Sequence, residues 1–169
     1  MIPKSNAAAQ PGWKQGLAWL AVSVILVFAA SRIGSAVSFA KLDPWYASLA
    51  KPAWTPPNAV FGPVWIVLYV LMALAAWLVW RASGWRRGKR ALLLYAMQLI
   101  LNFLWPILFF GLGWVFAALI DAVALWALLL ATLLEFRRHS TLATAGLVPY
   151  LLWMSYAVFL NWSVWRLNV

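Results

Sequence analysis

The sequence predicts an all-α integral membrane protein, a bundle of five transmembrane helices. Of its 169 residues, 66% are hydrophobic and only 9% are charged, whereas soluble domains carry roughly 25% charged residues. The apolar residues form continuous runs rather than the alternating segments of a membrane barrel, so helices are expected. Because each span takes about 20 residues, five spans nearly fill the chain and leave room for a single domain.

The first two spans lie on either side of a proline-rich segment. A short N-terminal arm, 1–14, precedes a single membrane domain, 15–169. The first span, 15–37, has no convincing small-residue cleavage site after its apolar stretch, so we expect an uncleaved helix rather than a signal peptide. Residues 51–63 contain four prolines and predict a structured loop. The second span, 62–81, is expected to begin near Pro63, since proline suits a first helical turn.

The remaining spans follow a basic segment, 81–90, which is expected to be a loop. Residues 91–134 contain a single charge, Asp121, and are about twice as long as one span. They must therefore fold back, and Gly111 and Gly113 mark the turn between a third span, 91–110, and a fourth, 114–134. The fifth span is 142–165.

Charge indicates the orientation and the partners. With five spans, nine of the thirteen Lys and Arg residues fall on the side of the N-terminus, which predicts that the N-terminus is inside. The net charge of +10 is explained by attraction to anionic lipid headgroups, so no nucleic-acid partner is expected. Continuous helical spans favour a bacterial cytoplasmic membrane.

The sequence offers no conventional catalytic or metal-binding set. It has no cysteine and a single histidine, His139, which is expected to be a solvated loop residue. Its only acids are Asp43, Asp121 and Glu135. These residues cannot supply a metal-binding cluster or an ordinary acid–base pair, so we expect neither a metal site nor an enzyme of conventional mechanism.

Polar residues at membrane depth cluster on the third and fourth spans. Gln98, Asn102 and Trp105 share one helical face with Tyr95, and we expect this face to point inward. Asp121 must be protonated, hydrogen-bonded or next to a wet cavity, because an unpaired carboxylate is costly in lipid. We expect it to hold the fourth helix against its neighbours. Interhelical hydrogen bonding would equally explain Asn102.

Aromatic residues extend this interior onto the second and fifth spans. Tyr150, Trp153, Ala157 and Asn161 form one stripe, and Trp65 with Tyr69 begins another. Indole faces combined with a few amides suit a flat conjugated ring, although packing between helices would also explain Trp65 and Trp105. Tryptophans near span ends are expected to be interfacial anchors: Trp13, Trp80, Trp85, Trp114, Trp162 and Trp165.

Four motifs carry a resemblance to a known family. The segments WYASLAKPAWTPPNAVFGPVWIVLY, QLILNFLWPILFFG and PYLLWMSYAVFLNWSVWRLN, with Asp121 between the last two, occur in this order over about 45–168. They resemble the TspO/MBR family, which comprises the tryptophan-rich sensory proteins and the translocator proteins, or peripheral-type benzodiazepine receptors.

The resemblance implies a five-helix homodimer that binds porphyrins such as protoporphyrin IX, haem-type tetrapyrroles and drug-like hydrophobic molecules as ligands, with no resident cofactor. It also implies that an outer membrane is an alternative location. Sterol binding is put in question, since LNWSVWR has Trp162 where the sterol pattern has tyrosine. Leu93 and Met97 replace the glycines of the dimer face in mammalian members. By motif position, the ligand-contacting residues are Tyr46, Trp54, Trp65, Asn102, Trp105, Trp153 and Ala157.

Three functions are consistent with these features. The first is a receptor or carrier of porphyrins with a sensory or regulatory role in tetrapyrrole or stress response. The second, implied by the resemblance, is light-dependent breakdown of porphyrin at Trp65 and Trp153. The third is secondary transport of small hydrophobic compounds, in which the buried acid Asp121 would take part. The sequence shows no internal repeat of helices, which argues against transport.

Overall fold

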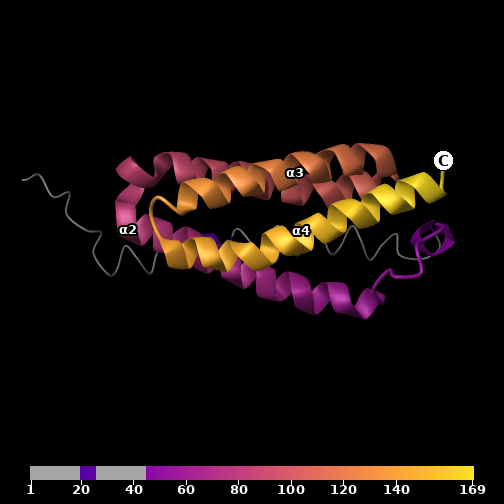
Figure 1. The fold of residues 1–169 in the computed structure, drawn as a ribbon, viewed down its shortest axis with the longest axis horizontal. Coiled ribbons are helices and arrows are strands. Elements are labelled where there is room, and N and C mark those ends of the chain that lie inside the picture. Colours follow the sequence, from indigo (N-terminus) through magenta and orange to yellow (C-terminus); the bar gives the residue numbers. More distant parts are fainter. Residues whose placement is uncertain (1–19, 26–44) are drawn as a thin grey trace, which may run out of the picture.

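The computed structural model describes residues 20–25 and 45–169. Across these ranges every regular element is helical, and the long helices lie side by side along one axis (Figure 1). Three helices are long and apolar enough to cross a membrane: Asn58–Gly111, Val115–Phe136 and Thr141–Leu167. Of the expected first span, only residues 20–25 belong to the described part, and they are helical. The count of five spans therefore stays a prediction.

Helix α2 (Asn58–Pro106) contains two antiparallel arms. The Tyr69 hydroxyl donates a hydrogen bond to Asn102 Oδ1 at 2.9 Å across 33 residues, which a straight helix would separate by about 50 Å. The reversal is at Gly84, whose φ of 61° and ψ of −178° belong to a region that is essentially restricted to glycine. We call residues 58–83 the first arm and residues 85–106 the second arm; Figure 1 shows them running in opposite directions.

Two expected boundaries of these spans were wrong. Residues 81–90 are not a loop but helical on both sides of Gly84, because a single glycine completes the reversal. The helix begins at Asn58 rather than at 62, after Pro57 in an extended conformation, and Pro63 lies in the second turn. Because proline has no N–H, the helix lacks one hydrogen bond to the Ala59 carbonyl oxygen at this position.

The expected glycine turn between the third and fourth spans is confirmed. The second arm continues into the π-helical turn η2 (Ile107–Gly111), and Gly113 then adopts a φ of +70° before α3 (Val115–Phe136) begins. A tight turn at Arg137–Ser140 leads to α4 (Thr141–Leu167). Ser140 caps α4, since its hydroxyl accepts a hydrogen bond from the Ala143 N–H at 3.2 Å.

The two basic turns lie at one end of the bundle and the proline-rich loop at the other, as the sequence predicted (Figure 1). At the basic end Ser83 Oγ is 2.7 Å from His139 Nδ1. Glu135 pairs with Arg138 at 3.2 Å and with Arg90 at 3.7 Å. The expectation of a solvated His139 was therefore only partly right: the residue lies in a turn and is half-buried, because the reversal at Gly84 brings Ser83 against it.

The main core fills the space between the two arms, α3 and α4. Its largest fully buried side chains include Met72, Leu125, Leu147 and Tyr150, while alanines of the first arm allow close approach of α4. Trp80 belongs to this core and is 5% exposed, so its expected role as an interfacial anchor was wrong. Trp85, Trp114 and Trp162 are exposed near helix ends, in agreement with the anchor prediction.

Candidate ligand-binding site

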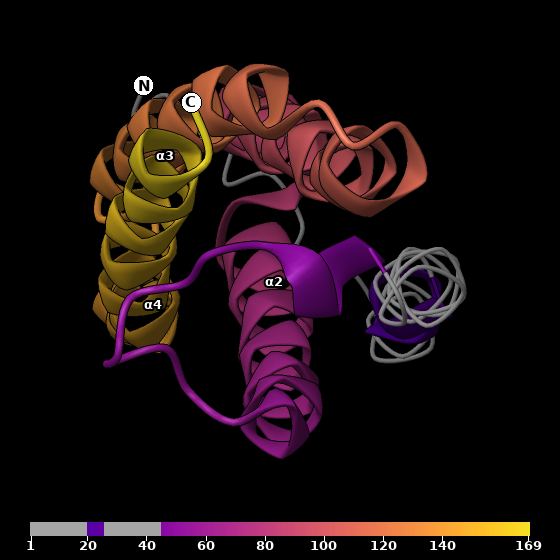
Figure 2. The ribbon, with the colours of Figure 1, turned by 90° about the vertical axis from the view of Figure 1, so that its right-hand side faces the viewer.

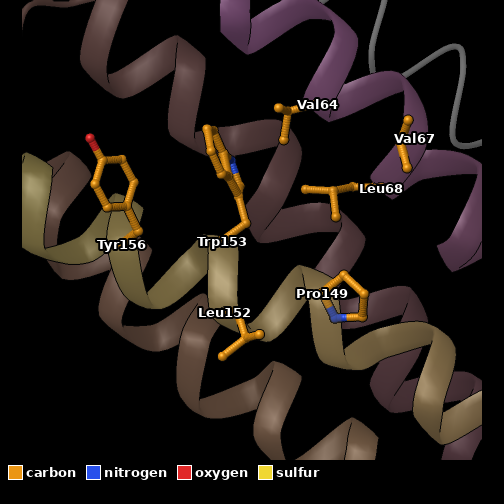
Figure 3. A pocket seen from close by; sticks show the side chains of 7 residues that line it. All are labelled: Val64, Val67, Leu68, Pro149, Leu152, Trp153 and Tyr156. Atoms are coloured by element: carbon orange, nitrogen blue, oxygen red, sulfur yellow. The ribbon is translucent and has the colours of Figure 1, made fainter. Parts of the chain in front are cut away.

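An apolar pocket opens on the side of the bundle between the first arm of α2 and α4 (Figure 3). Its volume is about 480 Å³, within the range of small-molecule sites in proteins. The lining residues recur at helical spacing on the facing sides of the two helices, so two turns of each helix are enough to line the pocket. They are Val64, Val67, Leu68, Pro149, Leu152, Trp153 and Tyr156.

Trp153 forms the aromatic wall of the pocket. Its indole extends from α4 toward the first arm (Figure 3). It packs edge-on against Phe61, with ring centroids 5.9 Å apart, and against Tyr156 at 5.7 Å. These two ring contacts restrict the indole, and the pocket therefore has an aromatic wall of fixed orientation.

The proline-rich loop, residues 49–57, follows a short helical turn at residues 45–48 and passes beside α4 before it returns to the start of α2 (Figure 2). The Tyr156 hydroxyl donates to the Trp54 carbonyl oxygen at 3.1 Å, and the Trp54 ring stacks on Phe159 at 5.3 Å. The Asn168 side chain exchanges two hydrogen bonds with the Ala50 backbone, at 2.9 and 3.0 Å. The loop is thus fastened to α4 at two points, one of them through a pocket residue.

A buried polar group lies next to the pocket. Asn102 accepts a hydrogen bond from Tyr69 at 2.9 Å and donates one to Tyr150 at 2.7 Å. Trp65 packs against both tyrosine rings, with centroids 5.3 Å from Tyr69 and 6.1 Å from Tyr150. The amide of Asn102 therefore joins both arms of α2 to α4. A ligand that hydrogen-bonds to Asn102 would have to displace Tyr69 or Tyr150 from this amide.

A second aromatic cluster lies near the proline-rich loop. Trp105 stacks on Phe109 with centroids 4.9 Å apart, and its indole N–H donates to Asn161 Oδ1 at 3.0 Å. Asn161 in turn donates to the Val115 carbonyl oxygen at 3.1 Å. Tyr46 packs against Phe109, and burial raises the pKa of its phenol above the usual value, with the nearby Tyr156 as a second cause. Tyr46 is therefore a neutral hydrogen-bonding group at physiological pH.

These contacts place the seven expected ligand residues. Trp153 lines the pocket, and Trp54 reaches it through Tyr156. Trp65 and Ala157 pack against the main core, as Trp153 does. Asn102, Trp105 and Tyr46 make interhelical or loop contacts and do not line the pocket. Sequence reasoning missed Tyr156, although its position three residues after Trp153 on the same face was a usable signal.

The three intramembrane polar residues behave differently. Asn161 links helices as described above. Gln98 is fully buried, and neither polar atom of its amide has a hydrogen-bond partner in the described part of the chain. The same holds for Asp121 Oδ2, and the expected role of Asp121 in holding α3 against its neighbours stays a prediction. Each unpaired buried polar group costs about 1–3 kcal/mol.

Comparisons with known proteins identify the family of this chain. The TspO/MBR family model matches residues 10–166. The tryptophan-rich protein TspO of Chlorobaculum tepidum is 38% identical over 151 residues, which cover 88% of this chain and 95% of that protein. The translocator protein of Homo sapiens is 43% identical over 129 residues, covering 73% and 75%.

A third relative is the tryptophan-rich sensory protein of Cereibacter sphaeroides, which is 41% identical over 128 residues, covering 76% of this chain and 79% of that protein. The family match extends over nearly the whole chain, and it includes the loop, both arms of α2, α3 and α4. The chain therefore belongs to the TspO/MBR family.

Proposed function

We propose that this membrane protein is a receptor or carrier for porphyrins and other flat hydrophobic molecules, with a sensory or regulatory role in tetrapyrrole or stress response. The observation that carries the proposal is the apolar pocket of about 480 Å³ between α2 and α4. A conjugated macrocycle would enter from the bilayer side, where the lining residues Val67 and Leu152 are exposed.

The chemistry of the pocket suits such a ligand. Stacking of a flat ring on an aromatic side chain contributes about 0.5–1.5 kcal/mol beyond the burial of its area, and Trp153 offers a ring held by Phe61 and Tyr156. The Tyr156 hydroxyl, bonded to the loop at Trp54, lies where a polar ligand edge would meet the headgroup region. A ligand that displaces this bond would loosen the loop, which offers a route from binding to signalling.

The names of the relatives, which include a sensory protein and a translocator protein, support sensing or carrying more than catalysis. A bacterial cytoplasmic membrane, an inside N-terminus and a homodimer complete the proposal. They rest on the charge distribution of the sequence and on the family resemblance.

Titration with protoporphyrin IX tests the proposal. The purified protein in detergent should show saturable quenching of tryptophan fluorescence, and Trp153→Phe should weaken the binding at least several-fold. Trp65→Phe should have a smaller effect because Trp65 lies beside the pocket rather than in its lining. Trp114→Phe, on an exposed residue at the start of α3, is the matched control. Equal affinities for Trp153→Phe and Trp114→Phe would place the ligand elsewhere.

Light-dependent breakdown of bound porphyrin is the second candidate. The observation in its favour is a continuous row of electron-rich rings, since Trp54 lies 5.6 Å from Tyr156 and Tyr156 lies 5.7 Å from Trp153. Illumination of the protein–porphyrin complex should then bleach the porphyrin absorbance faster than in empty micelles, and Trp153→Phe should remove the difference. Bleaching at the same rate in both samples would leave binding as the sole activity.

A further inference from the structure

The outward face of the second arm of α2 carries residues at heptad spacing. Four apolar side chains on this face follow one another at intervals of four, three and four residues, and each is at least 36% exposed: Leu93, Met97, Ile100 and Leu104. The row continues toward the basic end through Arg90 and Arg86, at intervals of three and four residues. This is the spacing of the positions along which two parallel helices pack. We call this row the seam.

A surface hollow of about 380 Å³ lies on the basic half of the seam. When helices pack as coiled coils, a side chain of one helix inserts among four residues of the other, and four such neighbours on a helix are i, i+3, i+4 and i+7. The lining contains two overlapping sets of this kind, and Arg87 completes it: Arg90, Leu93, Leu94 and Met97, and Arg86, Lys89, Arg90 and Leu93. We call the first set the apolar socket and the second set the basic socket.

A second copy of the chain fits the apolar socket. In the homodimer proposed above, both copies cross the membrane in the same direction, so their second arms run parallel and each seam residue meets its counterpart across the two-fold axis. Leu93 of one copy then enters the apolar socket of the other. Arg90 enters the basic socket by the same geometry, and Arg86 and Arg90 of both copies converge at the headgroup level, directly after the reversal at Gly84.

The chain does not balance these charges by itself. Glu135 lies 3.7 Å from Arg90, but it is shared with Arg138 at the shorter distance of 3.2 Å. Within the described residues, no ion pair is formed by three other cations of the hollow: Arg86, Arg87 and Lys89. Cations brought together in this way repel each other unless an anion lies between them. Arginine is suited to such an anion when it is a phosphate, because the guanidinium contacts phosphate through two parallel hydrogen bonds.

We propose that two copies of the chain hold one anionic phosphate group between their basic sockets, at the two-fold axis of the dimer. The inference rests on the proposed homodimer, because a single copy supplies only half of the cations. The phosphate belongs either to the headgroup of an anionic lipid or to a free phosphate ion, since both present the same oxygens to the arginines. Binding of the anion and dimerisation are therefore coupled: an anion that binds the dimer in preference to the monomer stabilises the dimer.

Sedimentation equilibrium of the full-length protein in detergent measures the coupling through the dissociation constant of the dimer. In one arm sodium phosphate replaces sodium chloride at constant ionic strength, and in the other phosphatidylglycerol replaces phosphatidylcholine in the mixed micelle. The dissociation constant of the dimer should fall about tenfold in the arm that supplies the anion. The arm in which it falls identifies the source as a free ion or a lipid headgroup.

Two variants of equal net charge make the test specific. Arg86→Gln removes one cation of each copy from the basic socket, so it should abolish the effect of the anion. In chloride without anionic lipid, the same variant should dimerise more tightly than the native protein, because the two copies repel each other less. Misfolding would not produce a gain of this kind. Arg137→Gln removes a charge from the same end of the bundle but outside the hollow, and it should keep the native response.

A third variant tests the seam itself. Leu93→Gln places a polar group in the apolar socket and should weaken the dimer in both arms. The affinity for protoporphyrin IX should stay native in all three variants, because none of the substituted residues lines the pocket beside Trp153, and this measurement also shows that the variants are folded.

Each contrary result has a distinct meaning. A dimer whose dissociation constant is unchanged in both arms would overturn the shared anion site and leave the homodimer in place. Equal loss of the response in Arg86→Gln and Arg137→Gln would mean that net charge alone is responsible. A native dimer in Leu93→Gln would move the interface to another face and remove the site. A protein that stays monomeric under every condition would overturn both the homodimer and the site, while protoporphyrin binding is judged by its own titration.

Discussion

Asn102 holds three helical segments together, and its replacement provides a direct test of the packing described above. Its amide oxygen accepts from Tyr69 on the first arm, and its amide nitrogen donates to Tyr150 on α4. In Asn102→Leu both tyrosine hydroxyls lose their partner while they stay buried, since Tyr150 is 0% and Tyr69 7% exposed. The variant should therefore be less stable than the native protein.

The size of the loss follows from the two bonds. Interhelical side-chain hydrogen bonds in membrane proteins contribute about 0.6 kcal/mol on average and about 1.7 kcal/mol at most. Because Tyr150 is fully buried, rearrangement toward another partner is restricted, so we expect Asn102→Leu to lower the free energy of unfolding by about 1–2 kcal/mol. Unfolding by sodium dodecyl sulfate in mixed micelles, followed by far-ultraviolet circular dichroism, measures this quantity.

The control variants separate hydrogen bonding from shape. Tyr69→Phe with Tyr150→Phe removes the two hydroxyls that Asn102→Leu leaves unpaired, so the triple variant should be no less stable than Asn102→Leu alone. If the costs of the three substitutions simply add, or if Asn102→Leu is neutral, Asn102 does not stabilise the bundle through these hydrogen bonds and the reasoning fails.

Three further predictions concern the turns of the bundle and use the same unfolding assay. Gly84→Ala should lower the free energy of unfolding by about 1–3 kcal/mol, because the backbone conformation at this position suits glycine alone. The control is Gly88→Ala inside the helix, whose added methyl would meet neighbours at 3.6 Å or more and which should be neutral or stabilising. Similar effects of the two substitutions would show that the reversal does not depend on glycine. Ser140→Ala should lower the free energy of unfolding by about 1 kcal/mol, because the N-terminus of α4 loses its capping hydrogen bond. An unchanged stability would show that this cap does not stabilise α4. Glu135→Gln should lower the free energy of unfolding by less than about 1 kcal/mol, because its ion pairs with Arg90 and Arg138 are exposed to solvent on the arginine side, and the loss should shrink in high salt. A loss that does not depend on salt would mean that Glu135 stabilises the protein by packing instead.

Much of the site could be predicted at the level of helix faces. The spacing of Gln98, Asn102 and Trp105 placed them on one inward face, and all three are buried or half-buried there. Spacing could not assign their partners, because a residue on an inward face meets whichever side chain the neighbouring helix presents at that height. Asn102 meets two hydroxyls and Trp105 meets Asn161, whereas Gln98 meets no hydrogen-bonding group in the described part of the molecule.

The sequence by itself determined the membrane class, the helical architecture, the turn at Gly113 and the separation of the basic end from the proline-rich loop. These properties depend on hydropathy, charge and backbone restrictions, all of which are local. Tertiary structure alone decided that Gly84 reverses α2 within one residue, and that Trp80 is buried in the core while Trp153 lines a pocket. Such outcomes depend on which helix faces meet and at what height, and that choice is made by packing between segments far apart in the chain.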